Sequence, residues 1–548
     1  MKYFNNLYKK IEHWFASPSG KLRINGINSK QWAFFFQNFF CEDGRNHFII
    51  CPNPDVAENF FETLKDQIPQ ENLLYFPGHE ASLYQNILPS EKNLLDRFKV
   101  LDLLSRGERS YVVISTIESF FLKIPPKSFF KDNLLKIAIS DVFSPMDLAK
   151  TLSGMGYSST VTVEEPGTFS KKGEIFDIYP ISSAPIRIAY FDEMVEKINL
   201  IDLESQKTLW DRPLEHVEFA PGPSLLTKEI FREKLRENIP QAPPSSRERF
   251  EKRKEIFSKL SNNLLFEDYA SFVPLFFSSP ETLFDFIPLN STITLLEGIS
   301  SSQSFLELME ELRVDFEKQE KNQSSDNLLP SPEKLYEISG WEKLEKVSHL
   351  EINPVEILAQ GDSMTERIDV ALEDFLLKIK PSHDKFEFFK NILNTVKNFF
   401  EHSGQIIFST HLESSRKEID YLLEGLDLSP EFKSRISFIK SNLQKGFYYN
   451  LEKTLVLTDG DLFGVKIAKV RAPSNQKTDL FAEQLSTLKK GDFVIHSNHG
   501  MGVYEGLEMV GTADFKTDCL VIRYDEGDKV YVPVYKINLV QKHADSSL

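Results

Sequence analysis

Short apolar runs alternate with amphipathic stretches over the first 125 residues of the chain. Residues 48–51 and 111–114 are continuous apolar runs of strand length, and residues 90–104 carry apolar side chains at helical spacing. Fully buried strands that alternate with amphipathic helices are typical of a parallel α/β sheet. The pattern therefore predicts a parallel-sheet lobe over residues 1–125, with a helix-rich second part over 211–320.

The pattern changes between residues 126 and 210. Apolar and polar residues alternate at 186–190, and a second run of strand character covers 195–203. Strict alternation is typical of strands that are buried on one face only. We expect a small α+β domain, inserted into the first lobe at 126–210.

Two linkers separate the two remaining domains. Residues 321–345 begin with a polar, proline-containing stretch that is typical of a linker. A small α/β domain is expected at 346–470, followed by a second linker at 471–487. Residues 488–543 hold short alternating segments joined by turn residues, which predicts hairpins closed into an SH3/Tudor-like β-barrel. The fold class expected for the whole chain is multidomain α/β.

Composition excludes several classes of protein. The 548 residues include 64 Lys and Arg against 81 Asp and Glu, a net charge of −17. This balance opposes a general DNA-coating role, which requires a phosphate-neutralising surface. Three cysteines are too few for a disulfide framework, and no run approaches the ~20 apolar residues that cross a bilayer. We expect a cytoplasmic protein with no membrane partner.

Phenylalanine is unusually frequent, with 46 residues against 4 tryptophans, and it often occurs in doublets. Aromatic side chains mostly serve burial. We expect the doublets to lie in cores, and the alternative is that they are exposed anchors for a partner.

No complete catalytic motif is present. A P-loop requires G-x-x-x-x-G-K-[ST], whereas the stretch from Gly26 to Gln31 has no glycine before Lys30 and a glutamine at the hydroxyl position. Gly26 and Lys30 therefore predict a degenerate, non-functional phosphate loop, and no cofactor is expected.

Two other polar pairs are better explained by structure than by chemistry. His496 and His499 lack the Cys or His cluster of a zinc site. Asp459 and Asp461 are expected to stabilise a turn or cap a helix rather than to act as an acid–base pair. We predict neither a catalytic nor a metal site.

Three segments in one order resemble a single protein family. Gly156-Tyr157 with residues 165–180 is similar to the G-x-F-x-x-R-G-x-x-x-D-[IL]-[FY]-P signature shared by bacterial transcription-repair coupling factors (Mfd) and the excision-repair protein UvrB. Residues 459–464 are similar to the D-L-x-G stretch of the coupling factors. Residues 491–504, with 531–534, resemble a CarD-like domain.

The resemblance covers nearly all of the chain and implies a domain plan. Residues 1–125 and 211–320 correspond to a UvrB-like module that has lost ATP binding, 126–210 to a UvrA-binding-type insertion, and 488–543 to a CarD-like domain. Members of the family continue into an ATP-driven DNA translocase. We therefore expect a non-enzymatic chain without a motor, which binds DNA only weakly or through a motor outside this sequence. Whether the native product continues past Leu548 stays open.

The resemblance also implies a UvrA-binding face on the insertion. Arginine of the family's R-G pair can form a two-pronged, charge-assisted contact with a carboxylate, whereas lysine here keeps only the charge. Serine stands where some relatives carry a basic residue. The alternative is that the glycine, aspartate and tyrosine only shape a turn. The candidate residues are Ser158, Lys172, Gly173, Asp177 and Tyr179.

The CarD-like domain is expected to dock on the β subunit of RNA polymerase. In this mode an edge strand pairs with a strand of the partner, and alternate side chains give specificity. The alternative is that the apolar residues fill the core of the barrel. The candidate residues are Tyr504, Leu507, Met509, Val510 and Leu520.

Together these features predict a recruitment function. We expect the chain to bind stalled RNA polymerase and UvrA, and so to couple transcription to nucleotide-excision repair. The alternative is a CarD-type transcription regulator with a vestigial UvrB-like module.

Overall fold

The computed structural model forms two compact units, Met1–Ile467 and Ala468–Leu548, which are described separately. The structure describes residues 5–16, 21–65, 67–78, 90–239, 247–262, 269–322, 329–354, 364–367, 385–400, 404–410, 412–441, 443, 445–449, 452–463, 490–496, 500–512, 515–524, 529–533 and 540–542.

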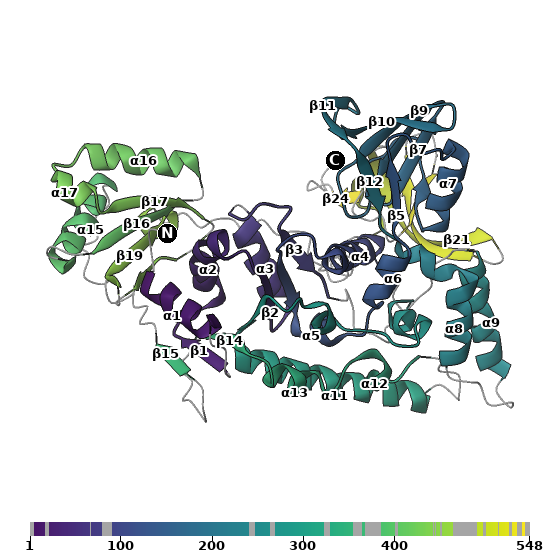
Figure 1. Cartoon of the computed structure of the whole chain (residues 1–548), viewed down its shortest axis with the longest axis horizontal. Coiled ribbons are helices and arrows are strands. Elements are labelled where there is room, and N and C mark those ends of the chain that lie inside the picture. Colours follow the sequence, from purple (N-terminus) through teal and green to yellow (C-terminus); the bar gives the residue numbers. More distant parts are fainter. Residues whose placement is uncertain are drawn as a thin grey trace. The chain divides into compact units, whose positions relative to one another are not determined.

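The first unit is built on a seven-stranded sheet in which every strand pair is parallel (Figure 1). This confirms the predicted parallel sheet, and two of its strands lie beyond residue 345, in the range predicted as a separate small α/β domain. The strand order is β15-β1-β14-β13-β2-β4-β3. The strands are β1 (Lys21–Asn25), β2 (Asn46–Cys51), β3 (Leu73–Phe76), β4 (Val112–Thr116), β13 (Ser291–Leu296), β14 (His349–Asn353) and β15 (Met364–Arg367).

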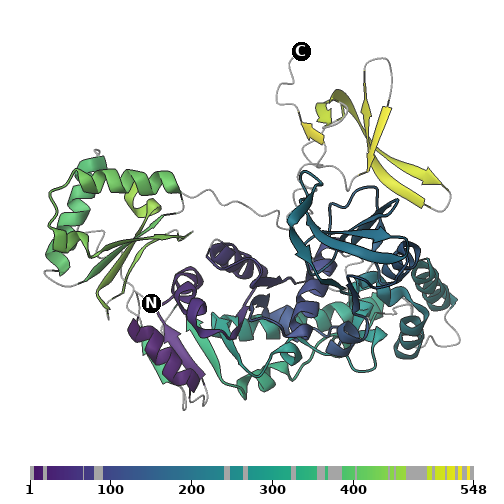
Figure 2. The same cartoon turned by 45° about the horizontal axis from the view of Figure 1, so that its top comes forward.

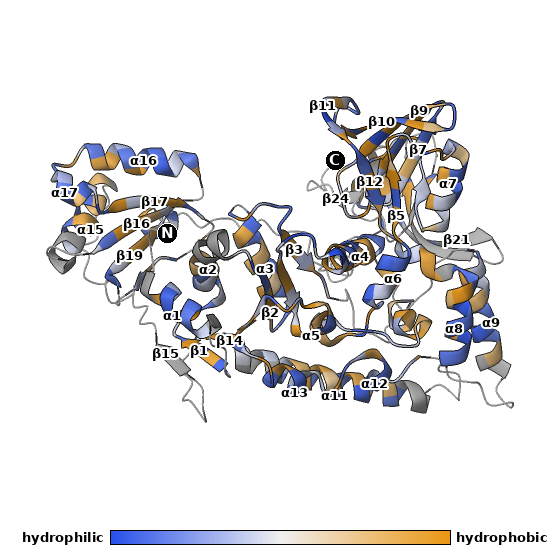
Figure 3. Ribbon diagram, in the orientation of Figure 1, coloured by the Kyte–Doolittle hydropathy of each residue, from blue (hydrophilic) through white to orange (hydrophobic). Residues whose placement is uncertain are grey.

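Both faces of this sheet are covered, which explains the continuous apolar runs. On β2, Phe48 and Ile50 lie in one core, whereas Ile49 and Cys51 lie in the other. Successive side chains of a strand point to opposite faces, so each residue of the run serves one of two cores. In Figure 3 apolar residues concentrate on strands, while many helices carry both colours.

The helices of this lobe begin and end at recognisable residues. Ser90 accepts a hydrogen bond from the backbone of Asn93 and so caps α4, and Gly107 ends that helix in a left-handed conformation. The helices are α1 (Asn5–Ala16), α2 (Ser29–Asp43), α3 (Pro54–Lys65), α4 (Glu91–Arg106), α5 (Ile117–Phe121), α6 (Lys127–Asp132), α8 (Glu229–Asn238), α9 (Arg247–Ser261), α10 (Tyr269–Phe272), α11 (Gly298–Asn322), α12 (Pro332–Leu335) and α13 (Gly340–Glu345), with 3₁₀ turns η1 (Pro223–Thr227), η2 (Val273–Phe276) and η3 (Leu283–Phe286).

The phenylalanine doublets at 120–121 and 129–130 lie in the core of this lobe, as predicted. Phe120, Phe121, Phe129 and Phe130 are all buried. Phe98 of α4 meets Phe129 and Phe130 edge-on, with ring centroids 6.0 and 5.6 Å away. Such pairs contribute beyond the area they bury. No described helix has the length and apolar character needed to cross a bilayer.

A buried carboxylate links two strands at one end of the large sheet. Glu351 of β14 is 4% exposed, and it accepts a 2.6 Å hydrogen bond from Arg23 Nε on β1. His349 Nε2 lies 3.3 Å from its other oxygen, and Lys21 Nζ lies 3.6 Å away. Burial alone raises the pKa of Glu351, but these hydrogen bonds and positive charges more than offset it and hold the pKa at about 2.

This ion cluster predicts an acid-sensitive contribution to stability. Because the folded pKa lies below the ordinary value of 4.5, the contribution is complete above pH ~4.5 and is lost as the pH falls toward 2. We expect the unfolding free energies of wild type and Glu351→Gln to converge by about 3 kcal/mol between pH 6 and pH 2. Urea denaturation at both pH values measures this, and a constant difference would contradict it.

A second sheet lies between β4 and β13 in the sequence. Six strands pair in the order β11-β10-β9-β8-β7-β6, antiparallel except for β6 with β7, and β5 pairs with β12. Helix α7 (Pro145–Gly154) and alternate strand residues share one core. The strands are β5 (Leu135–Ala138), β6 (Ser158–Ser159), β7 (Thr168–Lys172), β8 (Ile175–Tyr179), β9 (Ile186–Phe191), β10 (Met194–Ile201), β11 (Thr208–Leu214) and β12 (His216–Phe219).

A smaller mixed sheet completes the first unit, in the order β17-β16-β19-β18. Because β14 and β15 lie in the large sheet, the strands of this sheet begin at β16. Phe447 of β18 packs on Phe34 and Phe35 of α2, with ring centroids 5.6 and 5.2 Å apart. The elements are α15 (Lys385–Phe400), β16 (Gln405–Thr410), α16 (Glu413–Glu424), α17 (Pro430–Lys433), β17 (Ile436–Lys440), β18 (Phe447–Tyr449), β19 (Thr454–Thr458) and α18 (Asp459–Phe463).

The second unit is an antiparallel sheet in the order β23-β22-β21-β20-β24. Its long hairpin, β21 with β22, is drawn in yellow in Figure 2. Within the described residues the two outer strands do not pair with each other, so closure into a barrel stays a prediction. The strands are β20 (Phe493–His496), β21 (Gly500–Thr512), β22 (Phe515–Arg523), β23 (Lys529–Pro533) and β24 (Val540–Lys542).

Candidate functional site

The six-stranded sheet has one face toward its core and one face away from it. Phe176, Ile178, Ile186 and Ile188 point to the core and are buried. The residues between them, including Asp177 and Arg187, therefore lie on the opposite face, called the outer face below. Two predicted UvrA-binding residues, Lys172 of β7 and Tyr179 of β8, are in phase with Asp177 and therefore also lie on this outer face.

Asp177 is engaged inside the domain. It is 4% exposed, and the backbone register places it directly across from Arg187 of β9. Arg187 donates to both carboxylate oxygens, from Nε at 2.6 Å and from Nη2 at 2.8 Å. The hydrogen bond to Asp177 raises the pKa of Arg187. Such a two-pronged pair fixes geometry as well as charge.

Arg187 also holds the segments that cover the outer face. It donates to Thr208 Oγ1 at 3.1 Å and to the Gln206 carbonyl at 3.5 Å. Gln206 in turn donates to the Val163 carbonyl at 3.2 Å. Ser170 donates to the Val161 carbonyl at 2.8 Å. The Asp177–Arg187 pair therefore positions the loop between β6 and β7.

Lys172 ends β7, and Gly173 and Glu174 form the turn that joins it to β8; the Lys172–Gly173 pair is called the Lys172–Gly173 turn below. Gly173 has φ of 66°, and a Cβ added at this position would have no atom within 4 Å, so the left-handed backbone rather than crowding requires glycine here. The side chain of Lys172 is exposed. Lys172 is therefore an accessible cation of the predicted face, beside the exposed Lys171 and Glu174.

Ser158 and Tyr179 lie at the other end of β7. Both are register neighbours of Thr168, Ser158 from β6 and Tyr179 from β8. Ser158 is exposed, and partial burial raises the pKa of Tyr179. Four strand residues, about 13 Å, separate Thr168 from Lys172. The predicted residues therefore form two separate groups, with the buried Asp177 between them.

Three large apolar side chains near the Lys172–Gly173 turn are exposed, although residues of this kind are usually buried. Phe191 is 69% exposed, its register partner Met194 is partly exposed, and Val142, 74% exposed, bridges Met194. The sequence motifs did not single them out. The signal was the phase of β9, because Phe191 is in phase with Arg187 on the outer face and out of phase with the buried Ile186 and Ile188.

The hairpin of the terminal unit extends beyond the rest of its sheet. β20 pairs with β21 only at residues 500–503, whereas β22 pairs with it as far as residue 512. β23 pairs with β22 only at residues 519–523. Among the described strands, residues 507–512 and 515–518 therefore form a two-stranded ribbon whose outer edges have no strand partner.

The predicted polymerase-binding residues divide between the ribbon and the core. Leu507, Met509 and Val510 lie on the ribbon by their backbone, and their side chains are outside the described part of the structure. Tyr504 and Leu520 are buried, the position expected if they fill a core. Glu505 forms ion pairs of 2.8 Å with Arg523 and Lys529 at the base of the ribbon.

The degenerate phosphate loop is short and internally hydrogen-bonded. Gly26 and Ile27 donate their backbone N–H groups to the Asn353 carbonyl at 2.8 and 3.2 Å. Asn28 caps α2 by accepting from the Gln31 amide at 2.9 Å. A phosphate cradle requires free amides at this position. Lys30 lies in the first turn of α2, beside amides that are already used.

Asp461 has the structural role predicted for it. It accepts hydrogen bonds from the Thr458 amide and hydroxyl at 2.9 and 2.8 Å, and from the Gly446 amide at 2.7 Å. Asp459 is buried beside it. The side chain of His496 and the whole of His499 lie outside the described residues.

Comparison with known proteins matches these two regions to two families. Residues 135–223 match the UvrB interaction domain, and residues 488–544 match the CarD-like/TRCF RID domain. Strands β5–β12 fall within the first match and β20–β24 within the second.

Similarity to named proteins extends over most of the chain. Transcription-repair-coupling factors are 24% identical over 95% of this chain in Bacillus subtilis, 24% over 91% in Haemophilus influenzae and 23% over 90% in Escherichia coli. The chain is a relative of the transcription-repair-coupling factors. It covers 45%, 43% and 43% of these three coupling factors, less than half the length of each.

Proposed function

We propose that this chain recruits repair proteins to stalled RNA polymerase, as the recruitment part of a transcription-repair-coupling factor. The observation that carries the proposal is the presence of a UvrB interaction domain and a CarD-like/TRCF RID domain in one chain. In this proposal the first domain binds UvrA and the second binds RNA polymerase. Any motor activity belongs to a part of the coupling factor that this chain does not cover.

The ribbon of the terminal unit supports the polymerase contact. Residues 507–512 of β21 have one strand neighbour among the described residues, so their outer edge is available for pairing with a strand of a partner. Main-chain pairing of this kind gives affinity, and alternate side chains give specificity. We propose that the partner strand belongs to the polymerase β subunit, and that Leu507, Met509 and Val510 select it. Tyr504 and Leu520 support the ribbon from the core.

The Lys172–Gly173 turn supports the UvrA contact. Its charge is exposed, and the apolar Phe191 and Met194 lie at the same end of the sheet, since Lys172, Ile175 and Ala189 are successive register partners. We propose that this end meets UvrA. Asp177 acts as a positioning residue through Arg187, and Ser158 and Tyr179 contribute at the far end of β7.

Capture of UvrA by charge-reversed variants tests this proposal. We expect Lys172→Glu to weaken binding of purified UvrA about tenfold or more, because it reverses the sign of an exposed charge close to the apolar Phe191 and Met194. Lys150→Glu is the matched control, since Lys150 is exposed on α7, which packs against the opposite face of the sheet. Equal binding by wild type and both variants would refute the UvrA face.

One departure from the family pattern favours a second candidate function. Lysine stands at position 172, where the family carries an arginine suited to a two-pronged contact. A CarD-type regulator that binds polymerase and has no UvrA contact is the alternative. It predicts normal polymerase capture together with no capture of UvrA by the wild-type chain.

The β1–α2 loop supports a role without nucleotide turnover. Because its amides are bound to Asn353 and Asn28, we propose that it does not cradle a phosphate. ATP hydrolysis by the purified chain that is abolished by Lys30→Ala would contradict this.

A further inference from the structure

The UvrB interaction domain, called the inserted domain below, is joined to the parallel lobe by two neighbouring chain segments. Residues 133–134 lead into β5, and residues 220–222 lead out of β12. Leu135 and Phe219 are register partners, so the two segments lie side by side. Gly222 donates its backbone N–H to the Met155 carbonyl at 2.7 Å, close to the same point. An attachment at one point fixes where the domain is joined but leaves its rotation open.

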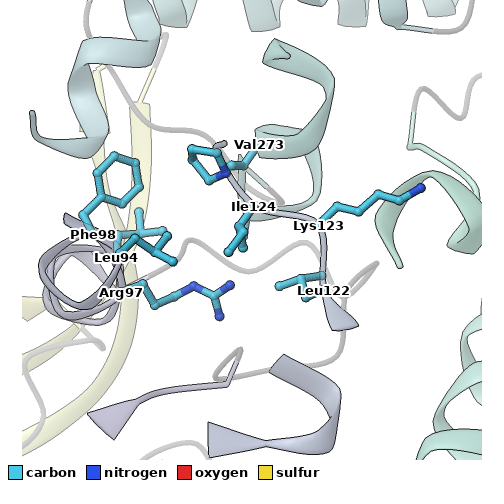
Figure 4. Close-up of a pocket in the computed structure, with 10 residues that line it drawn as sticks. Leu94, Arg97, Phe98, Leu122, Lys123, Ile124 and Val273 are labelled. Atoms are coloured by element: carbon cyan, nitrogen blue, oxygen red, sulfur yellow. The ribbon is translucent and has the colours of Figure 1, made fainter. Parts of the chain in front are cut away.

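Helix α4 of the lobe presents one side to its own core and a neighbouring side to the inserted domain. The first side includes Leu94 and Phe98, which belong to the core of the lobe and are drawn in Figure 4. The second side carries Leu95, Asp102 and Arg106. These three are seven and then four residues apart, and this spacing places them in one row along the helix.

This row meets the inserted domain at both of its ends. Leu95 packs against the apolar core of the domain. Gly167 of the domain comes close to it, since a Cβ at Gly167 would lie 3.5 Å from Leu95 Cδ2. Arg106 contacts the domain at the other end of the row, about 16 Å farther along the helix axis. Two contacts at this separation can fix the rotation that the attachment leaves open.

Arg106 joins a carboxylate of the lobe to a carboxylate of the inserted domain. Its Nη1 donates to Glu218 Oε2 of β12 at 2.7 Å, and its Nη2 lies 2.7 Å from Asp102 Oδ2 on its own helix. The side chains of Arg106 and Glu218 are 14% and 17% exposed, and Asp102 is 1% exposed. Charge-assisted contacts that are largely removed from water are the strong ones. This pair is therefore the polar contact that ties α4 to the domain.

The charges of this contact stay partnered if the domain rotates away from α4. Asp102 and Arg106 belong to one helix, so their ion pair remains with the lobe. Glu218 remains with the inserted domain, together with Lys136 of β5, whose Nζ lies 3.4 Å from its other oxygen. Burial raises the pKa of the Asp102 carboxyl, and Arg106 offsets only part of this rise, so contact with water would stabilise its charged form. Separation therefore leaves no isolated buried charge, which is the usual obstacle to breaking such a pair.

We propose that Arg106 is a positioning residue, whose ion pair with Glu218 is a latch that holds the inserted domain in one orientation on the lobe. When the pair separates, the domain rotates about residues 133–134 and 220–222. The latch thereby sets the direction in which the Lys172–Gly173 turn faces. It does not depend on which partner the inserted domain binds.

Distance measurements between the lobe and the inserted domain test the latch. Nitroxide labels on Lys65→Cys of α3 and Lys197→Cys of β10, both exposed positions, report the separation by double electron–electron resonance in the full chain. Cys41 and Cys519 are replaced by serine in this background, and Cys51 is buried and stays unlabelled. We expect one narrow distance distribution when the latch is intact.

Two substitutions of Glu218 open the latch without leaving a buried carboxylate unpaired. Glu218→Gln removes the charge, and it should widen the distribution about twofold or more. Glu218→Arg sets a second cation against Arg106 and should widen it further. Glu215→Arg is the matched control, because Glu215 is an exposed carboxylate directly before β12. This control should keep the narrow distribution.

Hydrogen exchange of β5 and β12 separates rotation from loss of folding. Both strands should stay protected in Glu218→Gln, since their pairing is made by the backbone. If Glu218→Arg loses this protection, Glu218→Gln alone decides the test. The latch is refuted if Glu218→Gln keeps the narrow distribution, if it loses the protection of β5 and β12, or if Glu215→Arg widens the distribution equally.

Discussion

Replacing Arg187 by leucine is expected to lower the unfolding free energy of the inserted domain by about 3–5 kcal/mol. The substitution leaves the Asp177 carboxylate, which is 4% exposed, without its two hydrogen bonds of 2.6 and 2.8 Å. An uncompensated buried charge is among the most destabilising single changes. Urea denaturation of the full chain, followed by hydrogen exchange on β8 and β9, measures the loss.

Two variants control for side-chain loss. The double variant Asp177→Leu/Arg187→Leu removes both charges and should recover part of the stability, because a buried ion pair replaced by apolar groups is often tolerated. Lys150→Leu alters an exposed cation and should change stability by no more than about 0.5 kcal/mol. A single Arg187→Leu variant as stable as Lys150→Leu would show that the pair has no such role. UvrA capture should fall with stability in Arg187→Leu, and without a stability change in Lys172→Glu.

Proline substitutions on the ribbon are expected to weaken polymerase capture. Successive residues of a strand direct their N–H groups to opposite edges. Of Met509→Pro and Val510→Pro, one therefore removes a donor facing β22 and the other removes a donor on the outer edge. We expect both variants to weaken capture of the polymerase β subunit about tenfold or more. The variant that loses the outer-edge donor should do so without loosening the hairpin. Pull-down, with hydrogen exchange of β22, distinguishes them.

Gln541→Pro provides the matched control on the opposite edge of the same sheet. It lies on β24, which pairs with β20 on one side only among the described strands. Polymerase capture should be unchanged in this variant. Loss of capture in Gln541→Pro, with normal capture in both ribbon variants, would move the contact to β24.

The parallel lobe was predictable from the sequence because its signal is local. The apolar run at 48–51 meets a core on each face, so four consecutive residues report the environment. Strand β14 gave no such signal, since its sequence alternates leucine and isoleucine with His349, Glu351 and Asn353. Those polar residues are buried, and Glu351 is stabilised by Arg23, more than 300 positions away in the chain. An analysis of neighbouring residues in the sequence therefore cannot identify Arg23 as the partner of Glu351.

The candidate docking residues also differ in how far the sequence alone could identify their roles. The Lys172–Gly173 turn follows from the family signature and from local turn chemistry. The role of Asp177 depends on Arg187, which is identified only once β8 and β9 are placed in register. Tyr504 and Leu520 alternate like their neighbours in the sequence, and only the placement of β20 and β23 shows that they are buried.

The ribbon of β21 and β22 exposes the chain to self-association as long as no partner strand covers its open edge. A strand with an open edge is a template for another copy of itself, and proteins usually protect such edges with charges. Glu508, Lys516 and Asp518 lie on the ribbon and place charges along it. At high concentration we expect homotypic, edge-to-edge association that grows with salt as these charges are screened. If RNA polymerase pairs with this edge as proposed, its binding would compete with this self-association.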